Sequence, residues 1–150
     1  MPRVLVVDDQ SHVRSAIVTV LEAKGGFSVA TAENGVDALK LFRASKFDLV
    51  VADLYMPGMD GVKLIKEMRT IDPNIAVVAI SGVLLRTTGR TALDLLSMNR
   101  DLSAIATLQK PFRPAQLQQA IKKALDLVAA QKGTARDAVA SPAEQAPTDG

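Results

Sequence analysis

The sequence predicts an α/β fold, in which helices cover both faces of a parallel sheet. Short runs rich in β-branched residues alternate along the chain with longer stretches whose apolar residues recur at helical spacing. Three of the short runs are continuously apolar, which is typical of strands buried on both faces. The chain has 150 residues, of which 48% are hydrophobic, so we expect one domain with a sizeable core.

The first two strand–helix pairs are delimited by turn residues. The first strand is predicted at residues 4–7, and Ser11 is a candidate N-cap for the helix that follows. The glycine pair at 25–26 ends that helix, and a second strand is predicted at 27–31. Asn34 and Gly35 resemble a hairpin turn, but apolar residues follow them at helical spacing, so we expect a helix to begin there.

The third strand is predicted at residues 49–52, where four apolar residues stand in a row. A loop with Pro57 and Gly58 follows it. A third helix then carries an apolar stripe over residues 62–68 and ends before Pro73, because proline is poorly tolerated inside a helix.

The remaining pattern predicts two more strands and two more helices. The fourth strand is expected at residues 75–80, a helix at about 91–98 and the fifth strand at 105–109. Apolar residues at helical spacing between 117 and 128 predict the last helix. From 131 to 150 the chain is rich in small and polar residues without any period, so we predict a disordered tail there.

The composition excludes several classes of function for the predicted domain, residues 1–130. The net charge of +2 is too small to indicate direct DNA binding or attachment to a membrane surface. The absence of cysteine excludes disulfides, zinc–thiolate sites and thiol catalysis, and the single histidine, His12, excludes a multi-histidine metal site. The longest uncharged stretch, residues 74–85, is shorter than the roughly 20 residues that a membrane span needs. We therefore expect a cytoplasmic protein.

Charged and hydroxyl side chains follow four of the predicted strands. Asp8 and Asp9 follow the first strand, Asp53 the third, Ser81 the fourth and Lys110 the fifth. Ligand sites of such folds lie beyond the carboxyl ends of the strands, so we expect these side chains to converge. Each alone is more often a loop or cap residue. Together they favour a site for Mg2+, which prefers oxygen ligands, and for a phosphoryl group held by hydroxyl and ammonium.

Four segments of the chain resemble the receiver domain of two-component response regulators, the CheY-like family. They read VLVVDD from residue 4, DLVVADLYMPGMDG from residue 48, VVAISG from residue 77 and LQKPF from residue 108. The resemblance spans residues 2–130. It implies a flavodoxin-like (βα)5 fold, a doubly wound five-stranded parallel sheet in the order 2-1-3-4-5.

The resemblance implies that Asp53 accepts a phosphoryl group from a histidine kinase. Ser81 matches the hydroxyl that moves toward that group on activation, and Lys110 matches the lysine that pairs with it. The peptide bond before Pro111 is often cis in the family. A phosphorylated aspartate is a labile acyl phosphate, which suits a reversible switch of a protein–protein interaction surface.

The resemblance also implies a metal site and partners. Asp8, Asp9, Asp53 and the backbone carbonyl of Tyr55 match the groups that hold Mg2+ in the family. The implied partners are a sensor histidine kinase or phosphotransfer protein and a downstream protein target, and pairing of two receivers is common. The protein is then a signalling module and not an enzyme. It is expected to stand alone, because few residues follow the last predicted helix.

Two departures from the family pattern keep alternatives open. Thr107 stands where the family usually has an aromatic residue, and the span from Ser81 to Lys110 is longer than usual. A pseudo-receiver that binds partners without phosphorylation is therefore one alternative. A Mg2+-dependent phosphohydrolase with an aspartate nucleophile is another. It is disfavoured because Tyr55 stands where such enzymes carry a second aspartate.

Overall fold

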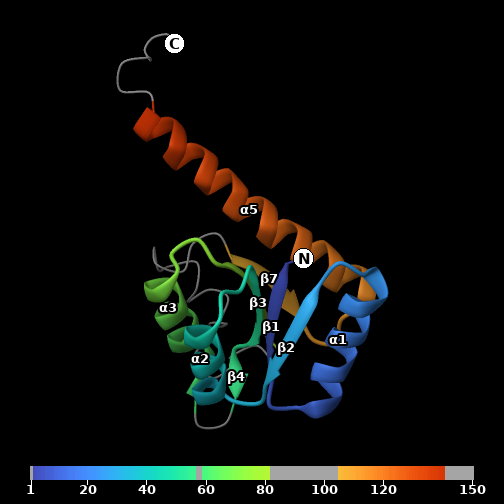
Figure 1. The fold of residues 1–150 in the computed structure, drawn as a ribbon. Helices are drawn as coiled ribbons and strands as arrows, with labels where there is room; N and C mark the ends of the chain where they lie inside the picture. The colour runs from blue at the N-terminus through green and yellow to red at the C-terminus, as the bar shows by residue number, and fades with distance from the viewer. Residues whose placement is uncertain (1, 57–58, 82–104, 141–150) are drawn as a thin grey trace, which may run out of the picture.

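The computed structural model describes residues 2–56, 59–81 and 105–140 of the chain. Its centre is a parallel five-stranded sheet in the order β2-β1-β3-β6-β7, which in chain order is 2-1-3-4-5 as predicted (Figure 1). The strands are β1 (Arg3–Val7), β2 (Ser28–Ala32), β3 (Leu49–Asp53), β6 (Ala76–Ser81) and β7 (Ile105–Gln109). The described helices are α1 (Ser11–Lys24), α2 (Gly35–Ala44), α3 (Gly61–Ile71) and α5 (Pro114–Ala140).

Helices cover both faces of the sheet, as the sequence predicts. Figure 1 shows α2 and α3 on one face and α1 and α5 on the other. Alternate residues of each strand face opposite layers, so Leu5 packs in the α2–α3 layer and Val6 in the α1–α5 layer. Both side chains are fully buried. Full burial of such a side chain stabilises the fold by roughly 1.5–3 kcal/mol, which makes the two layers the main source of stability.

The strand register brings the carboxyl ends of the strands to one edge. Val7 at the end of β1 pairs with Ala52 in β3, so the next residue of each strand stands at the same level. Asp53 in turn pairs with Ile80, and Ser81 with Gln109. The predicted site residues therefore follow the strands at a common level, as the sequence analysis expected.

Turn and cap residues delimit α1 and α2 as predicted, except at the start of α1. Gly25 and Gly26 end α1 with φ of 75° and 83°, backbone conformations that favour glycine. Asn34 caps α2, because its side chain accepts a hydrogen bond of 2.8 Å from the backbone N–H of Asp37. The N-cap of α1 is Gln10 and not Ser11, which is already the first residue of the helix.

Other segments depart from the sequence pattern or lie outside the description. A two-stranded antiparallel hairpin, β4 (Tyr55–Met56) and β5 (Met59–Asp60), was not predicted, because two-residue strands show no periodicity. The backbone of α5 is helical to Ala140 and extends beyond the sheet, past the apolar stripe at 117–128 that predicts this helix (Figure 1). The disordered tail expected from residue 131 stays a prediction. The helix expected at 91–98 and the end of the tail, 141–150, lie outside the described residues.

Within the described part of the chain, no helix is both long and apolar enough to cross a lipid bilayer.

We predict that Gly61→Ala destabilises the protein by about 1–3 kcal/mol, because the added methyl group overpacks the start of α3. A Cβ at Gly61 would lie 2.5 Å from the Cα of Leu54 and 2.7 Å from the carbonyl oxygen of Asp53, and backbone atoms cannot yield as a side chain does. Urea unfolding measures the effect. As a control, truncation of the exposed Val36 to alanine should change the free energy of unfolding by no more than about 0.5 kcal/mol.

Candidate functional site

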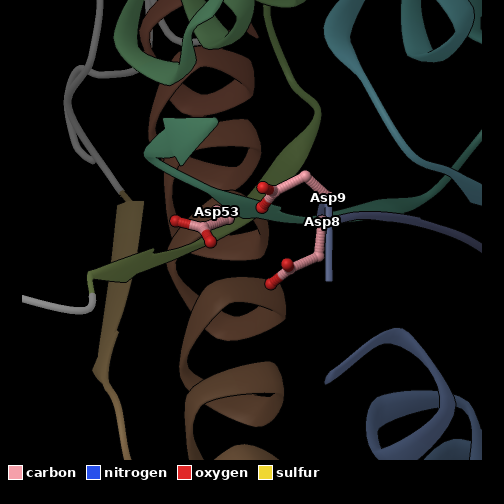
Figure 2. A group of neighbouring side chains, drawn as sticks. All are labelled: Asp8, Asp9 and Asp53. Carbon is pink, nitrogen blue, oxygen red and sulfur yellow. The ribbon is translucent and has the colours of Figure 1, made fainter. Parts of the chain in front are cut away.

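Three aspartates meet at the carboxyl edge of the sheet. Asp8 and Asp9 follow β1, and Asp53 ends β3. One carboxylate oxygen from each lies within 4.8 Å of the others, and Figure 2 shows the three carboxylates around a common space. Asp8 and Asp53 are buried, whereas Asp9 is exposed. The cluster is thus closed on the protein side and accessible from the side of Asp9.

Lys110, which directly follows β7, reaches this cluster. Its Nζ donates a hydrogen bond of 2.8 Å to Oδ2 of Asp53 and lies 3.2 Å from Oδ2 of Asp8. The side chain is 19% exposed, so both ion pairs are partly shielded from water. The peptide bond between Lys110 and Pro111 is cis, as the resemblance implies.

Three backbone contacts hold the turn between β1 and α1, which carries two of the acids. The N–H of Asp8 donates to the carbonyl of Ala32 in β2, at 3.2 Å. The carbonyl of Asp8 accepts a hydrogen bond of 2.6 Å from Nη1 of Arg14 in α1. Oδ1 of Asp8 accepts one of 2.8 Å from the N–H of Gln10. Contacts within the protein therefore fix both the direction of the backbone and the position of Oδ1 of Asp8.

The electrostatics of the site oppose the ionised form of Asp8 and favour that of Lys110. Burial raises the pKa of Asp8 above its ordinary value of 3.8, and the charge of Asp53 raises it further. The N–H of Gln10 and the ammonium of Lys110 offset this rise only in part. Burial alone would lower the pKa of Lys110, but the hydrogen bond and charge of Asp53 and the charge of Asp8 outweigh burial and raise it.

The donor set fits a hard divalent cation such as Mg2+. Two carboxylates about 4 Å apart repel each other by roughly 4 kcal/mol at an effective dielectric constant of about 20, and one lysine cannot neutralise three acids. Oδ2 of Asp8 is buried and accepts no hydrogen bond from the described residues, although Nζ of Lys110 lies 3.2 Å from it. A buried carboxylate oxygen without a donor is suited to bind a cation, directly or through a bound water. Asp8, Asp9 and Asp53 could together hold such an ion.

The structure brings together four of the predicted side chains, namely Asp8, Asp9, Asp53 and Lys110. The backbone of Tyr55 lies in β4, two residues after Asp53, and the use of its carbonyl as a metal ligand stays a prediction. Ser81 ends β6 opposite Gln109, but its side chain lies outside the description. The roles assigned to all these residues likewise stay predictions.

Sequence reasoning missed two residues that contact the site, Gln10 and Arg14. Gln10 directly follows the acidic pair, and its Oε1 lies 3.1 Å from Nζ of Lys110. Arg14 is one of several basic residues in the predicted helices, and neither its type nor its spacing distinguishes it from the others. Neither residue belongs to a motif, so only the fold could reveal these contacts. His12 is exposed in the first turn of α1.

We predict that Asp8→Asn stabilises the protein at pH 7 in buffer with a chelator. Because the pKa of Asp8 is raised by folding, this carboxyl favours the folded state below its ordinary pKa, and that contribution is lost as the pH rises through the folded pKa. The gain from Asp8→Asn should therefore grow from about pH 4 toward neutrality. Urea unfolding at several pH values, with exposed Asp126→Asn as the control, measures it. A variant less stable than the wild type at pH 7 would contradict the prediction.

Comparison with known proteins agrees with the geometry of the site. The family model of the response regulator receiver domain matches residues 4–122. Sporulation initiation phosphotransferase F of Bacillus subtilis is 34% identical over 125 residues, which cover 83% of this chain and 94% of that protein. Chemotaxis protein CheY of Thermotoga maritima is 33% identical over 122 residues, 81% of this chain and 95% of that protein. Some curated relatives are longer, and the chain spans about half the length of these.

Solved structures show the same architecture. A response regulator receiver domain protein from Clostridium thermocellum superposes with a TM-score of 0.71 at 27% sequence identity, and the match covers 90% of this chain and 99% of that one. The family match, the two relatives and the shared fold agree with one another. This chain is a CheY-like receiver domain and belongs to the response regulator family of two-component signalling.

Proposed function

We propose that this receiver accepts a phosphoryl group on Asp53, from a phosphohistidine of a sensor histidine kinase or a phosphotransfer protein. One observation carries the proposal: Asp53 is hydrogen-bonded to Lys110 at 2.8 Å and also shares a cluster of three carboxylates. A purely structural ion pair would not need the two further acids, whose repulsion costs stability. The cluster supports phosphorylation over a pseudo-receiver function.

The proposed reaction needs no general base. A carboxylate oxygen of Asp53 attacks phosphorus, the bond from phosphorus to the histidine nitrogen breaks, and the imidazole leaves with the bonding electron pair. The product is an acyl phosphate on Asp53. Since carboxylate is a weak nucleophile, the site must work by positioning and by neutralising charge. The ammonium of Lys110 is close enough to Asp53 to donate to an oxygen of the incoming phosphoryl group.

We assign the proposed Mg2+ site to Asp8, Asp9, Asp53 and the backbone carbonyl of Tyr55. When bound, Mg2+ supplies positive charge that offsets the charge of the phosphoryl oxygens. The residues of the chain keep the site ready: the turn after β1 holds Asp8 in place, and exposed Asp9 leaves the site open to solvent. Ser81 completes the proposal as the hydroxyl that turns toward the phosphoryl group.

The proposed consequence of phosphorylation is a change in a protein–protein interaction surface. New phosphoryl oxygens favour a conformation in which Ser81 and the end of β6 move toward the site, which shifts an existing equilibrium between two states. The target is a downstream protein or a second copy of the chain. Kinases draw phosphoryl groups from ATP, so we place the protein in the cytoplasm. Thr107, which is exposed in β7, stands at the position where the family usually has an aromatic residue. An aromatic side chain at this position therefore cannot report phosphorylation to a partner.

We predict that acetyl phosphate with Mg2+ adds one phosphoryl group to the wild type, because this small donor needs only the acceptor site. Intact-mass spectrometry measures the addition. Asp53→Asn should gain none, since it removes the nucleophile. The matched control Asp126→Asn, which changes an exposed aspartate on α5, should be modified like the wild type. Labelling of Asp53→Asn to the wild-type extent, or no labelling of the wild type, would overturn the proposal.

We predict that Lys110→Met slows phosphorylation about tenfold or more, because the phosphoryl oxygens lose a positioned donor. Mg2+ should bind to the variant at least as tightly as to the wild type, since the ammonium no longer pairs with Asp8 and Asp53. Time courses of labelling and calorimetric titration measure the two effects. The exposed Lys122→Met serves as the control. An unchanged labelling rate in Lys110→Met would contradict the role given to Lys110.

A further inference from the structure

Gln10 begins α1 without performing the usual task of a residue at that position. It occupies the N-cap with extended backbone (φ −94°, ψ 115°), yet its side chain makes no hydrogen bond to the helix. Serine, threonine, aspartate and asparagine are preferred at N-caps, because their short side chains accept a hydrogen bond from the first turn. The helix therefore forgoes a stabilising contact that a smaller residue would supply.

The side chain of Gln10 instead reaches a residue that is 100 positions away in the sequence. Its Oε1 accepts a hydrogen bond of 3.1 Å from Nζ of Lys110. The backbone of Gln10 is held firmly meanwhile. Its N–H donates to Oδ1 of Asp8 at 2.8 Å, and its carbonyl accepts from the N–H groups of Val13 and Arg14, both at 3.1 Å. A fixed backbone with a long side chain makes Gln10 a stable anchor for the ammonium.

The ammonium of Lys110 has three N–H donors, and three acceptors lie near it within the described part of the chain. Two donors form hydrogen bonds, to Oδ2 of Asp53 at 2.8 Å and to Oε1 of Gln10 at 3.1 Å. Oδ2 of Asp8 lies 3.2 Å from Nζ, the longest of the three separations, and accepts no hydrogen bond from the described residues. Three acceptors thus set the position of the ammonium, and Gln10 is the neutral one among them.

We propose that Gln10 is a positioning residue for Lys110. The carboxamide of Gln10 limits how strongly the lysine competes with Mg2+ for the carboxylates. This inference rests on the proposed function. Without Gln10, the ammonium would be held by Asp53 and Asp8 alone among the described residues, and it would shift toward Oδ2 of Asp8 to form a charge-assisted hydrogen bond, which is stronger than one to a neutral amide. Mg2+ would then have to displace that bond.

A neutral acceptor for Lys110 also suits the phosphorylation of Asp53. When phosphoryl oxygens arrive at Asp53, Lys110 must direct a donor to them, and it leaves a carboxamide more readily than a carboxylate. The side chain of Gln10 thus serves the site at the expense of the helix. Exchanging it for a capping residue should stabilise the protein and weaken Mg2+ binding, two effects of opposite sign.

The first test compares Gln10→Ser and Gln10→Ala with the wild type. Serine can cap α1 but cannot reach Lys110, so the melting temperature without Mg2+ should rise by about 2–5 °C. The dissociation constant for Mg2+, measured by calorimetry, should rise about threefold or more. Gln10→Ala should weaken Mg2+ binding similarly without the rise in melting temperature. Ser11→Ala, next along the exposed first turn, should leave Mg2+ affinity unchanged.

The second test repeats Gln10→Ser in a Lys110→Met background. If Gln10 acts through Lys110, the substitution no longer changes Mg2+ affinity there, and the double-mutant cycle shows coupling. An equal loss of affinity in both backgrounds, or no loss in the first, would overturn the inference. These outcomes differ from failure of the proposed function, in which the wild type would neither bind Mg2+ nor gain a phosphoryl group.

Discussion

The site depends on the parallel pairing of β1 with β3. Val7 is paired with Ala52, so that Asp8 and Asp53, 45 residues apart in the chain, follow at the same level of the sheet. A register shift of one residue would exchange the faces to which every side chain of a strand points. The same shift would move buried residues such as Leu5 and Val6 into the wrong core layers. The packing that stabilises the domain therefore also aligns the acids.

That alignment concentrates charge that the folded chain neutralises only in part. Lys110 pairs with Asp53 and Asp8, and Arg14 holds the carbonyl of Asp8, but the pKa of Asp8 stays raised by burial and by its acidic neighbour. The same unneutralised negative charge that destabilises the folded chain favours the binding of a cation. Proteins commonly sacrifice stability at functional sites in this way. The uncapped start of α1 at Gln10 is a second instance within the same turn.

Local sequence rules were most reliable far from the site and least reliable near it. Asn34 and the glycines at 25–26 delimit helices as their intrinsic preferences indicate. At Ser11 the preference for a cap was misleading, because the helix begins one residue earlier, with Gln10 as its N-cap. Hydrogen bonds from Gln10 and Arg14 to Asp8 shape the turn there. The hairpin of β4 and β5 and the length of α5 were also missed, since neither two-residue strands nor a helix rich in small polar residues has a clear apolar period.

Sequence patterns predict the five strands, the helices between most of them, and the side chains that follow each strand. Hydrophobic periodicity and strand-end position suffice for this, because burial of apolar residues is the dominant favourable term in folding. Only the tertiary structure decided that Lys110 contacts Asp53, Asp8 and Gln10 together, and that Arg14 secures the turn. Such contacts join residues as many as 100 positions apart, and their geometry follows from register and side-chain direction, which no local pattern encodes.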